Sequence, residues 1–136
     1  YYQRIAGLKE RVRKLKQTLS PEAFACHETV KLAYRIRKAD RETIPQNPDL
    51  PEYRRHGELR IYRRYKQGLR RYRLFFCFSN NPGIIIYLYL NDENHLRKAG
   101  DKNDPYEEFK RLAAKKYFSH EPGSPLIQRW LRSSRP

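Results

Sequence analysis

Basic and aromatic side chains are concentrated in one stretch of the chain. From Arg54 to Arg73 there are nine lysines and arginines and a single acid, Glu58, with tyrosines at positions 62, 65 and 72 among them. Guanidinium and ammonium groups bind phosphates, and aromatic rings stack on unpaired bases. Cations on one strand face repel one another, so their concentration favours an anion-binding surface over a merely solvated basic face. The stretch therefore predicts contact with a nucleic acid.

The overall charge indicates the same kind of partner. The 136 residues include 30 Lys and Arg against 15 Asp and Glu, a formal net charge of +15, and such a domain attracts polyanions. This length suits one domain with one core and excludes a multidomain enzyme. The longest apolar run, 83–90, is too short to cross a bilayer, and no signal segment opens the chain. We expect a single cytoplasmic domain over 1–136 with no membrane contact.

Neither a metal nor a nucleotide cofactor is expected. Cys26 and Cys77 lack the spacing of a zinc site and are interpreted as reduced structural thiols. The four histidines show no metal-binding spacing with acids, and His56, beside the basic stretch, is the one that merits a test. No glycine-rich loop leads from a strand into a helix.

Hydrophobic periodicity predicts a helical hairpin over residues 1–40. Apolar residues spaced by three and four from Ile5 to Leu19 indicate the first helix. Ser20 followed by Pro21 predicts the start of a second helix, which should run to about Ala39. Prolines at 45, 48 and 51 predict an extended connection over 44–57.

A change to a period of two predicts an antiparallel sheet over 58–91. In the first strand, from Leu59 to about Gly68, residues 60, 62, 64 and 66 share one face. In the next strand, about 70–79, residues 72, 74, 76 and 78 should face the core and 71, 73, 75 and 77 should point the other way. Residues 80–83 predict a turn, and the apolar run 84–90 indicates a central strand covered on both faces.

The last predicted element is a helix over 104–118. Asp104 is the expected N-cap, Pro105 suits the first turn, and Glu107 is the acid three residues after the cap. Residues 119–136 read as a tail, in which 126–131 could form a short amphipathic turn that docks on the domain or on a partner. The order of elements predicts an α+β domain with a small antiparallel sheet.

An ordered set of motifs resembles a known family. The set comprises PEYR at 51–54, RYRLFF at 71–76, NDEN at 91–94, HLR at 95–97 and KNDPYEEF at 102–109. It is similar to the YhaV-type toxins, a branch of the RelE/ParE superfamily of toxin–antitoxin systems, from the first helix to about Glu121. These toxins usually begin with a short strand, whereas this sequence starts inside the first helix. We expect that the strand either precedes the given sequence or is missing.

The resemblance implies a fold, an activity and a partner. The fold would be RelE-like, with the helical hairpin on one face of the sheet and a cationic RNA cleft on the other. The activity would be that of a metal-independent endoribonuclease that cuts messenger RNA on translating ribosomes. The partner would be a PrlF-type antitoxin with an AbrB-like domain, in a hetero-oligomeric complex. Such cleavage needs a base for the 2′-hydroxyl, cations at the phosphorus and an acid for the leaving 5′-oxygen.

The resemblance also implies roles for single residues. Arg73 matches the superfamily's strand arginine and would contact the phosphate. Arg64 and Lys66 match strand lysines, and Lys66 is the candidate base because arginines around it would disfavour its charged form. Tyr106 would stack on or protonate the substrate, although a core ring is an equal alternative. Acids stand where related toxins place an arginine after the central strand, so Arg97 is the candidate for that contact.

Six further residues are candidates for substrate binding, and two other functions remain open. The six are Arg60, Tyr62, Arg63, Arg71, Glu93 and Lys102. For Glu93, pairing with Arg97 is favoured over an acid–base role. A non-catalytic toxin of the ParE type would inhibit a protein target such as DNA gyrase, against which the joint presence of Arg64, Lys66 and Arg73 argues. A general RNA-binding module would bind in a salt-dependent way and yield no product.

Overall fold

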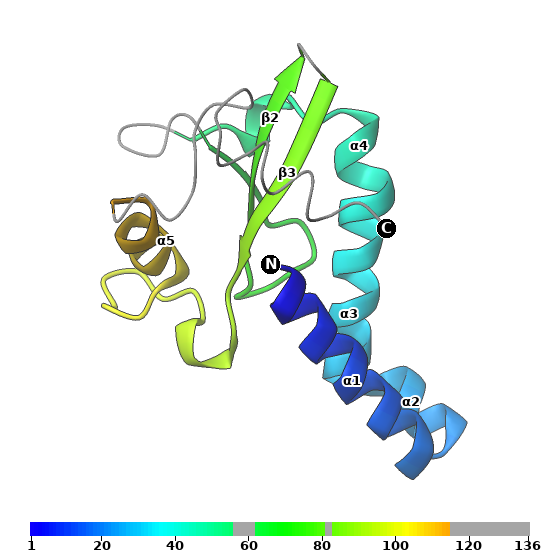
Figure 1. Ribbon diagram of the computed structural model, residues 1–136. Helices are drawn as coiled ribbons and strands as arrows, with labels where there is room; N and C mark the ends of the chain where they lie inside the picture. The colour runs from blue at the N-terminus through cyan, green and yellow to red at the C-terminus, as the bar shows by residue number, and fades with distance from the viewer. Residues whose placement is uncertain (56–61, 81–82, 115–136) are drawn as a thin grey trace.

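A three-stranded antiparallel sheet lies between two layers of helix in this α+β protein (Figure 1). The computed structural model describes residues 1–55, 62–80 and 83–114. Helices α1 (Tyr2–Thr18), α3 (Glu28–Lys38) and α4 (Ile44–Gln46) lie on one side of the sheet, α2 (Pro21–Cys26) packs on α1 and α3 beyond its end, and α5 (Pro105–Ala114) lies on the other side (Figure 1). In chain order the elements are α1 (Tyr2–Thr18), α2 (Pro21–Cys26), α3 (Glu28–Lys38), the π-helix η1 (Ala39–Thr43), α4 (Ile44–Gln46), the 3-10 helix η2 (Pro51–Tyr53), β1 (Arg63–Tyr65), β2 (Leu74–Asn80), β3 (Gly83–Leu90), the 3-10 helix η4 (Glu93–His95) and α5 (Pro105–Ala114).

The predicted helical hairpin is present, but its second helix is divided into α2 and α3. Ser20 caps α2, because its Oγ accepts the Ala23 N–H at 3.2 Å. The helix predicted to run from here to Ala39 is interrupted at His27, whose backbone is extended. The Nδ1 atom of His27 accepts the Thr29 N–H at 3.1 Å, so this residue ends α2 and caps α3. The prediction of one continuous helix is therefore wrong.

The extended connection predicted from residue 44 is also wrong at its start. The helix continues through the π-turn η1, closed by the Ile44 N–H on the Ala39 carbonyl, into α4. Pro45 has no backbone N–H to donate and lies directly after the π-turn, where the regular α-helical hydrogen-bond pattern is already altered. Ile36, Ala39 and Ile44 are fully buried against the sheet, which supplies the packing that prolongs the helix.

The strand order is β1-β2-β3, so the central strand among those described is β2. The prediction that the apolar strand 84–90 is central is wrong, although residues on both of its faces pack in a core. The predicted strand at 70–79 begins only at Leu74. It is preceded by a turn in which Gly68 has φ +75° and Arg70 has φ +54°, and this backbone cannot extend the strand. Of the strand predicted from Leu59, the described part is Arg63–Tyr65.

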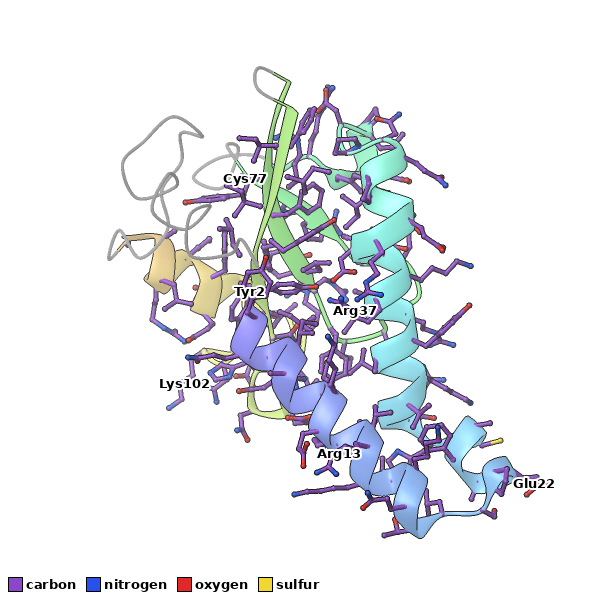
Figure 2. All side chains as sticks on the ribbon, turned by 45° about the vertical axis from the view of Figure 1, so that its right-hand side comes forward. Tyr2, Arg13, Glu22, Arg37, Cys77 and Lys102 are labelled. Carbon is purple, nitrogen blue, oxygen red and sulfur yellow. The ribbon has the colours of Figure 1, made fainter. Side chains whose placement is uncertain are left out.

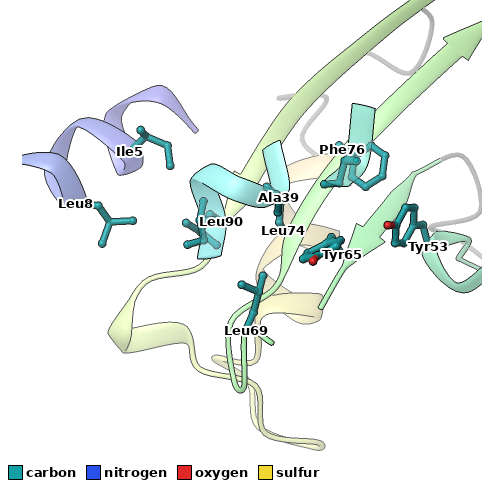
Figure 3. Packing of buried hydrophobic residues seen from close by; sticks show 11 residues of the cluster. Ile5, Leu8, Ala39, Tyr53, Tyr65, Leu69, Leu74, Phe76 and Leu90 are labelled. Carbon is teal, nitrogen blue, oxygen red and sulfur yellow. The ribbon is translucent and has the colours of Figure 1, made fainter. Parts of the chain in front are cut away.

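Each face of the sheet has its own core. On the helical side the buried residues are Ile5, Leu8, Ile36, Ala39, Ile44, Tyr53, Tyr65, Leu69, Leu74, Phe76 and Leu90 (Figure 3). On the other side Phe75, Cys77 and Leu88 pack with Phe109 of α5, and the Phe75 and Phe109 rings stack at 4.2 Å. Cys77 points away from the helical hairpin (Figure 2). The second face is thus an aromatic core under α5, which corrects the expectation of a cationic cleft across it.

The start of the last helix agrees with its sequence signals. Asp104 Oδ2 accepts the Tyr106 N–H at 3.0 Å, and Pro105 is the first helical residue. The described part of this helix ends at Ala114, so its predicted end at 118, the tail 119–136 and Arg60 lie outside the described residues. Within the described ranges, none of the helices combines the length and apolar character needed to span a bilayer.

Candidate active site

Three arginines lie close to Tyr106 at the edge of the aromatic core, and a fourth, Arg73, lies near one of them, Arg64. The guanidinium carbons of Arg55 and Arg97 each lie 4.7 Å from the ring centroid. Arg64 lies close to the Tyr106 side chain and feels the positive charges of Arg55 and Arg73. We call these five residues the arginine cluster. It unites four of the five predicted catalytic residues, Arg64, Arg73, Arg97 and Tyr106, with Arg55, whose role the sequence analysis missed.

Arg64 is a buried cation on β1. Only 8% of the residue is exposed, because alternation along the strand directs Tyr65 into the helical core and Arg64 toward the opposite face. Its Nη2 donates to the Glu52 carbonyl at 3.1 Å. Burial lowers the pKa of Arg64, and the charges of Arg55 and Arg73 lower it further. A cation in this position is costly unless an anion compensates it.

Three buried donors in the cluster have no acceptor. The Nε atoms of Arg55, Arg64 and Arg73 are inaccessible and make no hydrogen bond. Within the described part of the chain, none of these three arginines forms an ion pair with a carboxylate, whereas Arg63 and Arg97 each do. A buried unsatisfied donor costs about 1–3 kcal/mol. Three arginines from separate segments therefore bring positive charge together without a carboxylate to compensate it, which favours an anion such as a phosphate beside the cluster.

Asp104 positions Arg97 as well as capping α5. Its carboxylate is 2% exposed, and Oδ1 accepts both from Arg97 Nη1 and from the Lys98 N–H, each at 2.7 Å. Its Oδ2 accepts the Tyr106 N–H. The Asp104 side chain therefore fixes the positions of both Arg97 and Tyr106, and Arg97 lies over the Tyr106 ring. The capping signal at Asp104 was readable in the sequence, but its pairing with Arg97 was not.

Glu93 is not the partner of Arg97, so that expectation is wrong. Glu93 instead accepts from Arg11 Nη1 of α1 at 2.6 Å and lies 3.7 Å from Arg4 Nη2. Partial burial would raise the pKa of Glu93, but its hydrogen bonds, including that from Arg11, outweigh burial and lower it. Glu93 therefore ties the segment after β3 to α1, away from the cluster.

Arg73 is positioned by Asn91, a residue to which the sequence analysis gave no role. The buried Asn91 Oδ1 accepts the Arg73 N–H at 2.7 Å, and Nδ2 donates to the carbonyls of Arg71 and His95 at 3.1 and 2.8 Å. The Arg73 guanidinium donates back to the Arg70 carbonyl at 2.5 Å. Arg73 thus precedes β2 and is half-buried, which corrects its predicted position on a solvent-side strand face.

The ring of Tyr106 packs in the core, which confirms one of the two roles expected for it. Its ring edge meets Phe75 with centroids 5.4 Å apart, so it belongs to the aromatic core. Arg55 and Arg97 lie over the same ring, which leaves little of its face for a nucleic-acid base. The hydroxyl, which meets Arg64, is the part suited to chemistry.

Several predicted substrate-binding residues lie apart from the cluster. Tyr62 is 1% exposed against Phe109, so its ring cannot stack on a base, and burial raises its pKa to about 12. Arg63 points to the other face of β1 and pairs with Asp49 at 3.2 Å. Arg71 is exposed beside the cluster, where its Nε donates to the Arg97 carbonyl at 3.2 Å.

The two predicted lysines are exposed at the surface. Lys66 lies in the turn after β1, and its side chain makes no hydrogen bond or ion pair within the described residues. Lys102 lies on the loop before α5 and points outward (Figure 2). No group of three His, Cys, Asp or Glu side chains in the described ranges is arranged to hold a metal ion.

Comparison with known proteins gives one family. Residues 1–121 match the model of a family described as a toxin with endonuclease activity, of a toxin–antitoxin system. The "Ribonuclease toxin YhaV" of Escherichia coli strain K12 is 36% identical over 97 residues, which cover 68% of this chain and 63% of that protein. The "Toxin YhaV" of Escherichia coli O157:H7 matches to the same extent. The chain thus spans less than two thirds of the length of these relatives. No solved structure matches it.

Proposed function

Since the chain belongs to the YhaV family of toxins, we propose that it cleaves RNA at the arginine cluster as the toxin of a type II toxin–antitoxin system. The observation that carries the proposal is the set of buried, unpaired Nε donors on Arg55, Arg64 and Arg73. Guanidinium groups stabilise the negative charge that develops on a five-coordinate phosphorus, and they do so best in a site that excludes water.

The cleavage that we propose needs no metal ion. The 2′-oxygen forms a bond to phosphorus while the bond from phosphorus to the 5′-oxygen breaks, which leaves a 2′,3′-cyclic phosphate and a 5′-hydroxyl. Arg55, Arg64 and Arg73 hold the phosphate oxygens, and Tyr106 gives its hydroxyl proton to the leaving 5′-oxygen. Lys66 is the proposed acceptor of the 2′-hydroxyl proton, from its exposed turn beside the strand that carries Arg64.

The proposed substrate is messenger RNA on translating ribosomes, in the cytoplasm. Exposed cations outside the cluster, Arg71 and Lys102 among them, would bind flanking phosphates. The proposed partner is a PrlF-type antitoxin with an AbrB-like domain, in a hetero-oligomeric complex. A net charge of +15 supports rapid, salt-sensitive association with both.

Primer extension on a defined messenger RNA tests the activity. The wild type should cut in the presence of EDTA, and Arg73→Ala should reduce cutting at least about 100-fold, as loss of one oxyanion donor does elsewhere. Arg13→Ala is the matched control, because Arg13 is an exposed arginine of α1 that pairs only with Glu10 in the described part of the chain. Parallel reactions with and without ribosomes determine whether the ribosome is required.

Two outcomes would contradict the proposal. If the wild type stops growth but leaves RNA intact under every condition, a protein target such as DNA gyrase becomes the better explanation. If it binds RNA in a salt-dependent way without any product, it is a binding module.

A further inference from the structure

A pocket with an apolar floor and a charged rim, apart from the arginine cluster, lies on the helical side of the loop that leads to Arg73. It has a volume of about 160 Å³ and is bounded by α3, by α1 and by loop residues 68–72. Its charged lining residues are Arg11, Glu28, Lys31, Arg35, Arg70 and Glu93. None of them belongs to the arginine cluster, and the proposed cleavage does not use this pocket.

The charges of the pocket are unbalanced. Four cations face two acids, an excess of two positive charges. Glu93 is held by Arg11 at 2.6 Å, and Glu28 lies 3.5 Å from Arg70. Lys31 and Arg35 are one turn apart on α3 and therefore share a face, and neither forms an ion pair with a carboxylate among the described residues. An anion entering the pocket would meet these two cations.

The size and the charge of the pocket decide which anion fits. Pockets for nucleotides and other small molecules usually exceed roughly 300 Å³, so this one suits a single side chain. Because Glu93 and Glu28 already pair with Arg11 and Arg70, only Lys31 and Arg35 are left to compensate an anion, which matches one or two negative charges and not a chain of phosphates. We infer that the pocket docks an aspartate or glutamate side chain from an acidic segment of a protein partner. If the proposed function holds, that partner is the antitoxin.

Arg70 connects the pocket to the arginine cluster. It is the one described non-glycine residue with a positive φ, a conformation that costs free energy and that often marks functional segments. Its side chain lines the pocket, while its carbonyl accepts from the Arg73 guanidinium at 2.5 Å. An acidic occupant that contacts the Arg70 side chain therefore binds at the residue whose carbonyl holds Arg73.

The test is an NMR titration of the full chain with a hexaglutamate peptide. The peptide should shift the amide signals of Gly68, Leu69 and Arg70 in a saturable way and that of Arg73 more weakly. Lys31→Glu should raise the Kd at least tenfold, whereas Lys38→Glu, the same charge change on α3 outside the pocket, should alter it less than twofold. Arg35→Gln is a second variant, and circular dichroism shows that each variant is folded.

Either of two results would overturn the inference. Equal weakening by Lys31→Glu and Lys38→Glu would show that the peptide binds to the general charge of the surface. Shifts of the same amides by hexauridylate, with none from the peptide, would make the pocket an RNA contact. The titration measures binding, so it tests the pocket even if the protein does not cut RNA. Absence of peptide binding would in turn leave the proposed cleavage unaffected.

Discussion

The side chain of Asn91 accepts the backbone N–H of Arg73 at 2.7 Å, which joins the residue after β3 to the residue before β2. The register of the sheet explains this contact, because Leu74 and Leu90 are paired and the next residues outward face each other. The Asn91 side chain is fully buried and also donates to two carbonyls, so all of its polar atoms are used. The Asn91 carboxamide thus fixes the position of Arg73 directly before β2.

Replacing Asn91 by alanine should impair both stability and cleavage. Buried backbone groups of Arg71, Arg73 and His95 lose their partner, so the free energy of unfolding should fall by about 1–3 kcal/mol. Cleavage per folded molecule should fall at least about tenfold because Arg73 is no longer held. Urea unfolding and primer extension measure the two effects, with Asn94→Ala, an exposed neighbour, as control. Full cleavage by the folded variant would show that Asn91 has only a structural role.

Arg64→Met should abolish cleavage without loss of stability. Burial of the Arg64 guanidinium disfavours its charge, and a methionine of similar length removes that penalty while it fills the site. We expect no fall in the free energy of unfolding and at least about a 100-fold loss of cleavage. Leu74→Ala, in the other core, should show the reverse pattern, with about 2–5 kcal/mol of stability lost. A strongly destabilised Arg64→Met protein would mean that the arginine holds the fold together.

The variant Tyr106→Phe distinguishes the role of the Tyr106 hydroxyl from that of its ring. Phenylalanine keeps the contacts with Phe75, Arg55 and Arg97, so the melting temperature should change little. If the hydroxyl is the acid, cleavage should fall about 100-fold or more. Tyr34→Phe, at an exposed tyrosine of α3, is the control. Wild-type rates in Tyr106→Phe would assign protonation of the 5′-oxygen to another group.

Stability should decline in alkaline solution. Burial raises the pKa of Cys77 from 9.0 to about 11 and that of Tyr62 from 10.0 to about 12. Above pH 9 the unfolded chain loses these protons while the folded chain keeps them, so the unfolded state gains stability as pH rises. The free energy of unfolding should therefore be constant up to about pH 9 and then fall between about pH 9 and 12. Urea midpoints at pH 7, 9 and 10.5 check this, and an unchanged midpoint at pH 10.5 would contradict it.

Local signals in the sequence were enough to predict much of the fold. Ser20 and Asp104 cap the helices that they were expected to cap, and the apolar spacing from Ile5 onward predicted α1. The change of period from helix to strand and the turn signal at 80–83 predicted the antiparallel hairpin of β2 and β3. These features depend on residues within one or two turns of one another, so they can be read from neighbouring positions.

The contacts that assemble the site depend on packing between distant segments. Whether Arg97 pairs with Glu93 or with Asp104 is decided by the position of α1, which holds Glu93, and by the cap of α5. Likewise, α5 covers the second face of the sheet because Phe109 stacks on Phe75. The family resemblance singled out Arg64, Arg73, Arg97 and Tyr106, but nothing in the sequence indicated that Arg55 and Asn91 lie beside them. Such choices follow from shape and burial where separate elements pack together, and no local spacing encodes them.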